Sequence, residues 1–159
     1  MLTKVNMTAL GRRDALRLAG AGAAAFVAAS LLPNLAQADA GKAAKAIKEI
    51  TGGKALQQGR ITLELPQIAE NGNTVPIAFE VESPMTDADH VKAVHIFADG
   101  NPIPYVASIR FSPASGRARA ATRMRMAKTQ NVIAVAEMSD GSVYMAKSEV
   151  KVTIGGCGG

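Results

Sequence analysis

Apolar and polar residues alternate along most of the chain after residue 60. Between residues 61 and 65 every second side chain is apolar, and residues 75–82 repeat the pattern. A period of two is typical of half-buried β-strands, because successive side chains of a strand point to opposite faces of its sheet. With turn-forming residues as boundaries, the same reasoning predicts further strands at residues 91–98, 105–111, 117–126, 130–138 and 143–154. About seven short strands separated by turns indicate a mainly β protein, an antiparallel β-sandwich.

Two segments depart from this alternation. Residues 130–138 are apolar on both faces, which predicts a central strand or one covered by an interface. In residues 39–51, apolar side chains instead recur at helical spacing among lysines, before the pair Gly52-Gly53. This spacing predicts one short amphipathic helix that ends at the glycines. Its lysine face is more simply explained by solvation than by a binding site.

The N-terminal segment has the layout of an export signal. Arg12-Arg13 precede the stretch Leu18–Leu32, which carries no charge and is rich in alanine and glycine. A twin arginine before such a stretch is typical of the twin-arginine export route. The alternative is an amphipathic or membrane-spanning helix, but about 15 uncharged residues fall short of the roughly 20 that a span needs. We therefore expect a periplasmic protein.

Small residues after this stretch suggest where the signal is removed. Ala38 and Ala40 each complete a small-x-small pattern of the kind that precedes a cleavage site. The expected organisation is a cleaved twin-arginine signal over residues 1–38, a helix plus β-sandwich domain over 39–154 and a terminal arm over 155–159.

The net charge of +5 belongs largely to this signal. Cleavage would remove four of the 18 basic residues and one of the 13 acidic residues, which leaves 14 and 12. Aromatic residues make up 4% of the chain and tryptophan is absent. A sequence with so little charge excess and no set of interleaved aromatic residues gives nucleic-acid binding little support.

The C-terminus holds the first candidate for chemistry. Cys157 is the only cysteine, and it lies between Gly155-Gly156 and Gly158-Gly159. Glycines at a chain end predict a flexible arm, and its extended backbone would place Cys157 roughly 10 Å beyond Ile154. The small arm would admit the thiol to a narrow channel, although it supplies no base to form the reactive thiolate. The alternatives are an incidental free thiol and a disulfide that forms a dimer.

Arginines on one predicted strand are the second candidate. Arg117, Arg119, Arg123 and Arg125 fall on one face at a period of two. The simpler interpretation is a solvated outer face of the sheet. The alternative is a docking surface for acidic partners, where arginine would add steering and specificity.

The two histidines do not form a recognisable site. His95 shares a predicted strand face with apolar residues, and His90 lies in a turn. No cysteine or second histidine stands at metal-ligand spacing from them, so we expect no metal site. A hydrolase that uses Cys157 with His95 as its base would need an oriented nucleophile, which the glycines disfavour.

The terminal segment Lys151–Gly159 resembles the carrier arm of the SoxY family. Members of this family are the thiol-bearing subunits of the SoxYZ sulfur carrier in thiosulfate oxidation. The similarity also includes segments 101–104, 122–130 and 135–141, together with the twin-arginine signal. It covers essentially the whole mature chain, and the intact Gly-Gly-Cys-Gly-Gly terminus is its specific part.

The resemblance implies a carrier that is not itself an enzyme. It implies an immunoglobulin-like β-sandwich that pairs with SoxZ and holds sulfur intermediates covalently on Cys157, with no cofactor of its own. The enzymes visited by the arm would be the haem protein SoxAX, the manganese hydrolase SoxB and, where present, SoxCD. SoxZ would cross the membrane with this chain, and no stable membrane association is expected after export. We expect Val132–Met138 to form a buried layer near the SoxZ interface.

Two other functions remain open at this stage. One is an exported thiol enzyme, similar to a sulfurtransferase, that uses Cys157 catalytically. The other is a secreted interaction sandwich whose tail cysteine only forms a disulfide dimer. The first predicts turnover by the chain alone, and the second predicts that the thiol is dispensable for activity.

Overall fold

The computed structural model describes residues 35–153, with side chains from residue 41 onward. Cys157, the rest of the predicted arm and most of the predicted export signal lie outside the described residues. Within the described part, no helix is long and apolar enough to cross a membrane.

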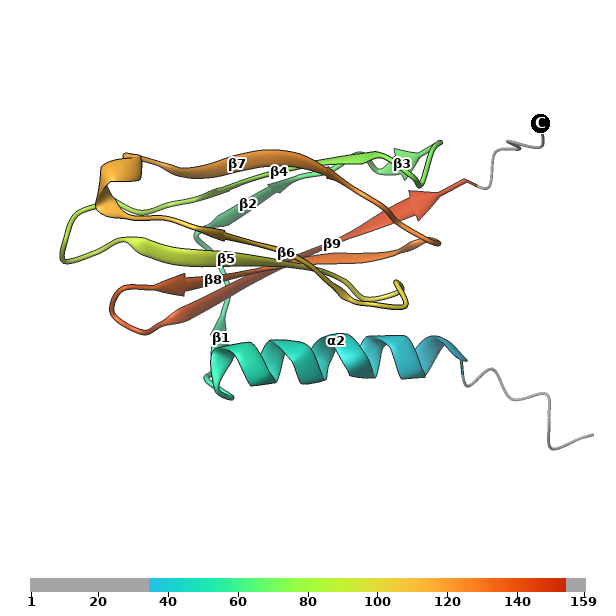
Figure 1. Ribbon diagram of the computed structural model, residues 1–159, viewed down its shortest axis with the longest axis horizontal. Coiled ribbons are helices and arrows are strands. Elements are labelled where there is room, and N and C mark those ends of the chain that lie inside the picture. The colour runs from blue at the N-terminus through green and yellow to red at the C-terminus, as the bar shows by residue number, and fades with distance from the viewer. Residues whose placement is uncertain (1–34, 154–159) are drawn as a thin grey trace, which may run out of the picture. The chain divides into compact units, whose positions relative to one another are not determined.

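Two β-sheets face each other, and one helix covers the outer face of the larger sheet (Figure 1). The smaller sheet has the order β2-β4-β7, with bounds β2 Ile61–Glu64, β4 Val75–Val81 and β7 Ala118–Met124. The larger sheet has the order β1-β9-β8-β5-β6, with bounds β1 Leu56–Gln57, β9 Val143–Val152, β8 Gln130–Met138, β5 Val91–Ala98 and β6 Tyr105–Arg110. Strand β3 Ile68–Ala69 also belongs to the larger sheet, where it pairs with β9 outside this order. The remaining elements are α2 Leu35–Thr51 and the 3-10 turn η1 Pro113–Ser115. This arrangement confirms the predicted fold, a mainly β, immunoglobulin-like sandwich with a short N-terminal helix.

Most strands lie where the alternation predicted them. Strands β5 and β8 have the predicted bounds, whereas β7 is shorter than the predicted 117–126 at both ends. The prediction missed β1 and β3, two-residue strands that pair in parallel with opposite ends of β9. A two-residue strand is too short to show a period, so only the tertiary structure reveals it.

The main core lies between the sheets. In β4, Val75, Ile77, Phe79 and Val81 are buried, and the polar or small residues between them point outward. The ring of Phe79 meets that of Phe111 edge to face, with centroids 6.2 Å apart. The period of two in the sequence thus separates the core face from the solvent face, as expected for a sheet with one wet side.

Strand β8 is buried on both faces because α2 covers the second one. Val132 and Ala134 point into the core between the sheets, whereas Ile133 and Val135 pack with Ile47 of the helix. The strand is central, as predicted. Its burial needs no partner protein, however, so the two-sided apolar pattern gives no evidence for the expected SoxZ interface.

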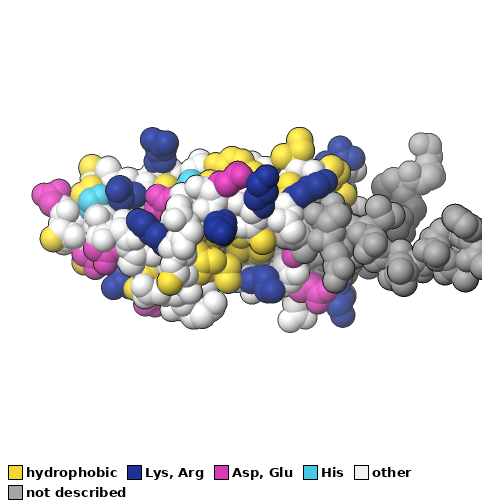
Figure 2. Space-filling model, turned by 90° about the horizontal axis from the view of Figure 1, so that it is seen from below, with side chains coloured by type: hydrophobic (Ala, Val, Ile, Leu, Met, Phe, Trp, Pro, Cys, Tyr) yellow, Lys and Arg dark blue, Asp and Glu magenta, His cyan; other side chains and the backbone are white. Residues whose placement is uncertain are grey.

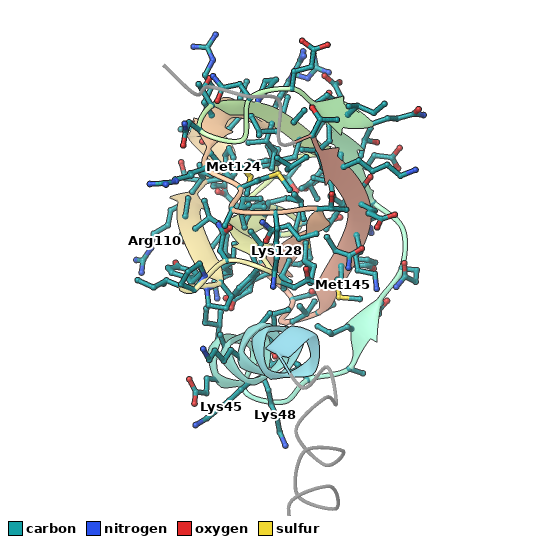
Figure 3. All side chains as sticks on the ribbon, turned by 90° about the vertical axis from the view of Figure 1, so that its right-hand side faces the viewer. Lys45, Lys48, Arg110, Met124, Lys128 and Met145 are labelled. Atoms are coloured by element: carbon teal, nitrogen blue, oxygen red, sulfur yellow. The ribbon has the colours of Figure 1, made fainter. Side chains whose placement is uncertain are left out.

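Helix α2 begins at Leu35, four residues before the predicted start, and ends at Thr51 as predicted. Its buried residues Ala43 and Ile47 face the larger sheet. Lys45 and Lys48 point away from the sheets (Figure 3), and Lys45 is 4.0 Å from Glu49 on an exposed surface. In the view from the helix side, basic side chains are interspersed with apolar ones and form no continuous patch (Figure 2). These features are those of a solvated face.

Candidate functional site

The end of β9 is the described point nearest in sequence to Cys157. The amide of Thr153 donates a hydrogen bond of 3.1 Å to the carbonyl of Ala69, and the amide of Val152 donates one of 3.0 Å to Thr129 Oγ1. Lys151 is held in the same way by the carbonyl of Gln67. The last described residues are therefore tied to neighbours on both sides. We call residues Lys151–Thr153 the root of the predicted arm, and these hydrogen bonds fix its position on the sandwich.

Two loops are joined beside this root. The β5–β6 loop, residues 99–104, contributes Asn101, which donates to the carbonyl of Arg125 at 2.8 Å and accepts from the amide of Ala127 at 3.0 Å. These partners belong to the β7–β8 loop, residues 125–129, which also contains Thr129. The root and both loops thus form one hydrogen-bonded unit.

Gln130, the first residue of β8, adds hydrogen bonds to this unit. Its side chain is 4% exposed; Oε1 accepts from the amide of Gly100 at 2.7 Å, and Nε2 donates to Asn101 Oδ1 at 2.9 Å. A buried amide with all its groups paired is strongly oriented, because an unpaired partner would lose a hydrogen bond without gaining one to water. Asn101 and Gln130 belong to the segments that resemble the SoxY family, but their sequence pattern predicted no role for them. The dipeptide Asn101-Pro102 is a common turn signal, and it was the one local feature that marked this loop in the sequence.

Two glycines allow the backbones to approach closely here. A Cβ atom on Gly72 would lie 2.5 Å from the carbonyl oxygen of Met126, and one on Gly100 would lie 2.9 Å from the Cβ of Gln130. The carbonyl of Gly72 also accepts a 2.7 Å hydrogen bond from the amide of Met126. Both positions therefore exclude any larger residue without a shift of their neighbours.

The arginine stripe lies along an edge of the smaller sheet, but its members differ. Arg119 and Arg123 belong to β7, and Arg117 and Arg125 flank it; all four are exposed. Arg117 forms an ion pair with Glu80 of β4. Arg125 lies at the opposite end of the strand, beside the β5–β6 loop. At one end of the predicted docking surface, Arg117 is thus paired with a carboxylate of the same sheet. At the other end, Arg125 lies next to the loops around the root of the arm.

His95 lies on the outer face of the larger sheet. Its Nε2 is 3.6 Å from Glu137 Oε1, and its Nδ1 is buried without a hydrogen-bond partner. Burial lowers the pKa of His95 because it disfavours the charged ring; Glu137 opposes this shift, while the positive charge of Arg110 adds to it. The neutral ring would suit a general base, but the structure does not describe Cys157, so their pairing stays a hypothesis.

His90, which was predicted to lie in a turn, has a structural role. His90 Nδ1 lies 3.0 Å from the carbonyl of Thr86, within the turn predicted before β5. Among residues 35–153, no three His, Cys, Asp or Glu side chains gather in a group that could hold a metal ion.

A sequence model of one protein family matches the chain. The model describes the sulfur oxidation protein SoxY, and it matches residues 47–157. A comparison with curated protein sequences gave no match.

Several solved structures share the fold. The sulfur carrier protein SoxY from Chlorobium limicola f thiosulfatophilum is 35% identical, with a TM-score of 0.62 over 72% of this chain and 94% of that one. A superoxide reductase (neelaredoxin) from Ignicoccus hospitalis gives a TM-score of 0.54 at 15% identity, over 60% of this chain and 81% of that one. A putative superoxide reductase from Thermotoga maritima gives 0.52 at 16% identity, over 62% and 94%. The likeness to the two reductases shows the fold alone.

Proposed function

The chain belongs to the SoxY family of sulfur oxidation proteins, and from this premise we propose that it is a periplasmic carrier which holds thiosulfate-derived sulfur covalently on Cys157. One observation carries the proposal: the family match runs from residue 47 to residue 157, so it ends on the chain's only cysteine. The carrier would act with partner enzymes and catalyse no step itself.

Loading joins thiosulfate to the thiol by oxidation. The Cys157 thiolate and the sulfane sulfur of thiosulfate form an S–S bond, and two electrons leave to the haem partner SoxAX. The product is a cysteine S-thiosulfonate. Water then cleaves the bond between the sulfane sulfur and the sulfonate in SoxB, which releases sulfate with two protons and leaves a cysteine persulfide. SoxCD, where present, would oxidise the remaining sulfane sulfur.

In this proposal the sandwich and the arm have different roles: the sandwich fixes where the arm starts, and the arm carries the thiol. The sandwich fixes the root at Thr153 through the carbonyl of Ala69, and the four glycines around Cys157 would let the thiol move. A tethered thiol stays at high effective concentration near each enzyme, so reactive intermediates need not diffuse. The arm has no base of its own in sequence, and we propose that the visited enzymes activate its thiol.

The remaining parts of the proposal concern export and assembly. We propose export by the twin-arginine route, which transports folded cargo, and a heterodimer with SoxZ that crosses the membrane with this chain. No cofactor is required for the carrier role beyond the sulfur adduct on Cys157.

Intact-mass analysis of the protein from thiosulfate-grown cells tests the proposal. We expect added masses of sulfane sulfur and thiosulfonate on the wild type, and none on Cys157→Ser, because serine cannot form the S–S bond. Cells grown without thiosulfate are the control for unrelated oxidation of the thiol.

Three results would contradict the proposal. A wild type without sulfur adducts under all turnover conditions would refute the carrier role. Catalytic turnover by the purified chain would favour a thiol enzyme, whereas a carrier loads stoichiometrically. Full activity of Cys157→Ser would favour an interaction protein with a dimerising cysteine.

A further inference from the structure

The root of the arm limits where a partner enzyme can sit. Thr153 is held by Ala69, and Cys157 lies four residues further along the chain. At full extension these residues carry the Cys157 backbone about 14 Å from Thr153. An enzyme that takes the sulfur into a pocket must therefore bring the pocket mouth within this distance. Its surface then meets whatever surrounds Thr153.

We call this surrounding surface the collar: strand β3, the β5–β6 loop with the first residue of β6, and the β7–β8 loop. Hydrogen bonds join the β7–β8 loop to the root through Thr129 and to the β5–β6 loop through Asn101. Figure 3 looks onto this end of the sandwich, with Lys128 near the middle.

Exposed apolar side chains are concentrated in the collar. Among the described residues, the exposed large hydrophobic side chains are Ile103 at 77%, Ile68 at 57% and Tyr105 at 40%. Ile68 belongs to β3, Ile103 to the β5–β6 loop, and Tyr105 directly follows that loop. Single exposed apolar residues are common, so it is their position around the root of the arm that makes this end of the sandwich a candidate contact surface.

A depression beside Ile103 offers a seat for a partner side chain. It has a volume of about 380 Å³ and is lined by Asn101, Pro102, Ile103, Arg125 and Ala127. The hydrogen bonds of Asn101 to Arg125 and Ala127 hold its two walls together. Because its walls are already held in place, this depression would lose little conformational entropy when a partner side chain binds in it.

We propose that the collar, centred on Ile103 and this depression, is the surface on which enzymes that process the carried sulfur dock. The inference rests on the proposed carrier function. The walls determine the partner's chemistry: Pro102, Ile103 and Ala127 fit an apolar side chain, and Arg125 fits a carboxylate beside it. The fitting partner is thus an enzyme whose pocket mouth bears an apolar residue next to an acidic one.

Paired aspartate substitutions test the collar. Ile103→Asp places a charge in the collar, and the control Ala114→Asp places the same charge on exposed η1 at the opposite end of the sandwich (Figure 1). Each full-length variant replaces the wild type in thiosulfate-grown cells, and intact mass follows Cys157 loading in extracts supplied with thiosulfate. We expect Ile103→Asp to load about tenfold more slowly, because central interface residues carry most of the binding energy. Ala114→Asp should load as the wild type does.

A second variant tests the acidic partner group. Arg125→Glu should also slow loading, and its difference from the wild type should shrink as salt rises, because exposed charges are screened. A deficit that salt leaves unchanged would overturn the carboxylate assignment.

The rate at which iodoacetamide alkylates the purified proteins measures the reactivity of the Cys157 thiol when no partner enzyme is present. We expect equal rates for the wild type and Ile103→Asp. Equal loading of Ile103→Asp and Ala114→Asp would overturn the proposal. A changed alkylation rate in Ile103→Asp would also overturn it, because the substitution would then act on the thiol itself and not on the docking of an enzyme. A wild type that takes up no sulfur would instead refute the carrier function on which the proposal rests.

Discussion

Gln130 shows what a single residue does at the root of the arm. Its side chain contacts the amide of Gly100 and the side chain of Asn101, and thereby links the start of β8 to the β5–β6 loop. In sequence it is an ordinary polar residue at the start of an apolar strand. Its role depends on partners about thirty residues away, which no local pattern specifies.

We predict that Gln130→Ala lowers the free energy of unfolding by about 1–3 kcal/mol, because the buried amide of Gly100 loses its acceptor. Urea denaturation measures the change. The control Gln67→Ala removes the same side chain at an exposed position and should have little effect. Equal stability of the two variants would show that the Gln130 contacts contribute nothing measurable.

Helix α2 decides how the larger sheet is covered. Ile47 packs in one small core with Phe97 of β5, Ile133 of β8 and Val143 of β9, so that three strands and the helix share it. The helical period was visible in the sequence, as was the two-sided apolar pattern of β8. The sequence did not show that α2 packs on β8, because an amphipathic pattern identifies an apolar face but not the element that covers it.

We predict that Ile47→Ala destabilises the protein by about 2–5 kcal/mol, because it leaves a cavity between the helix and the sheet. Urea denaturation again measures the loss. Lys45→Ala, on the outer face of the same helix, is the matched control and should change stability little. A similar loss in both variants would show that the packing of Ile47 is not what makes α2 stabilising, because alanine favours the helix equally at both positions.

For the whole molecule, the relation between the sandwich and its C-terminus matters most. Strand β9 pairs with β8 along its length and with β1 and β3 near its two ends. It therefore fixes the place from which residues 154–159 continue. A short arm on a fixed root would make the position of Cys157 depend on arm length.

Deletions within the arm test this dependence. Removing Gly155 and Gly156 would draw Cys157 back by about 7 Å, and we expect loading in thiosulfate-treated extracts to fall on the order of tenfold or more. Removing Gly158 and Gly159 deletes the same residue type without moving the thiol towards the root, and should matter much less. Equal effects would show that glycine content, rather than reach, limits loading.

The sequence by itself determined the seven longer strands, the helix and the candidate thiol. Alternation in residues 75–81 identified β4, helical spacing identified α2, and the glycines around Cys157 set it apart from the rest of the chain. These features are local, because side-chain direction follows directly from backbone period.

Only the tertiary structure decided which distant residues meet. It placed α2 over β8, paired Arg117 with Glu80, and joined Asn101 and Thr129 into the surface around Thr153. Such contacts depend on how sheets stack and loops close. Hydrogen bonds between loops have no period in the sequence, so the collar emerges only when the chain is folded.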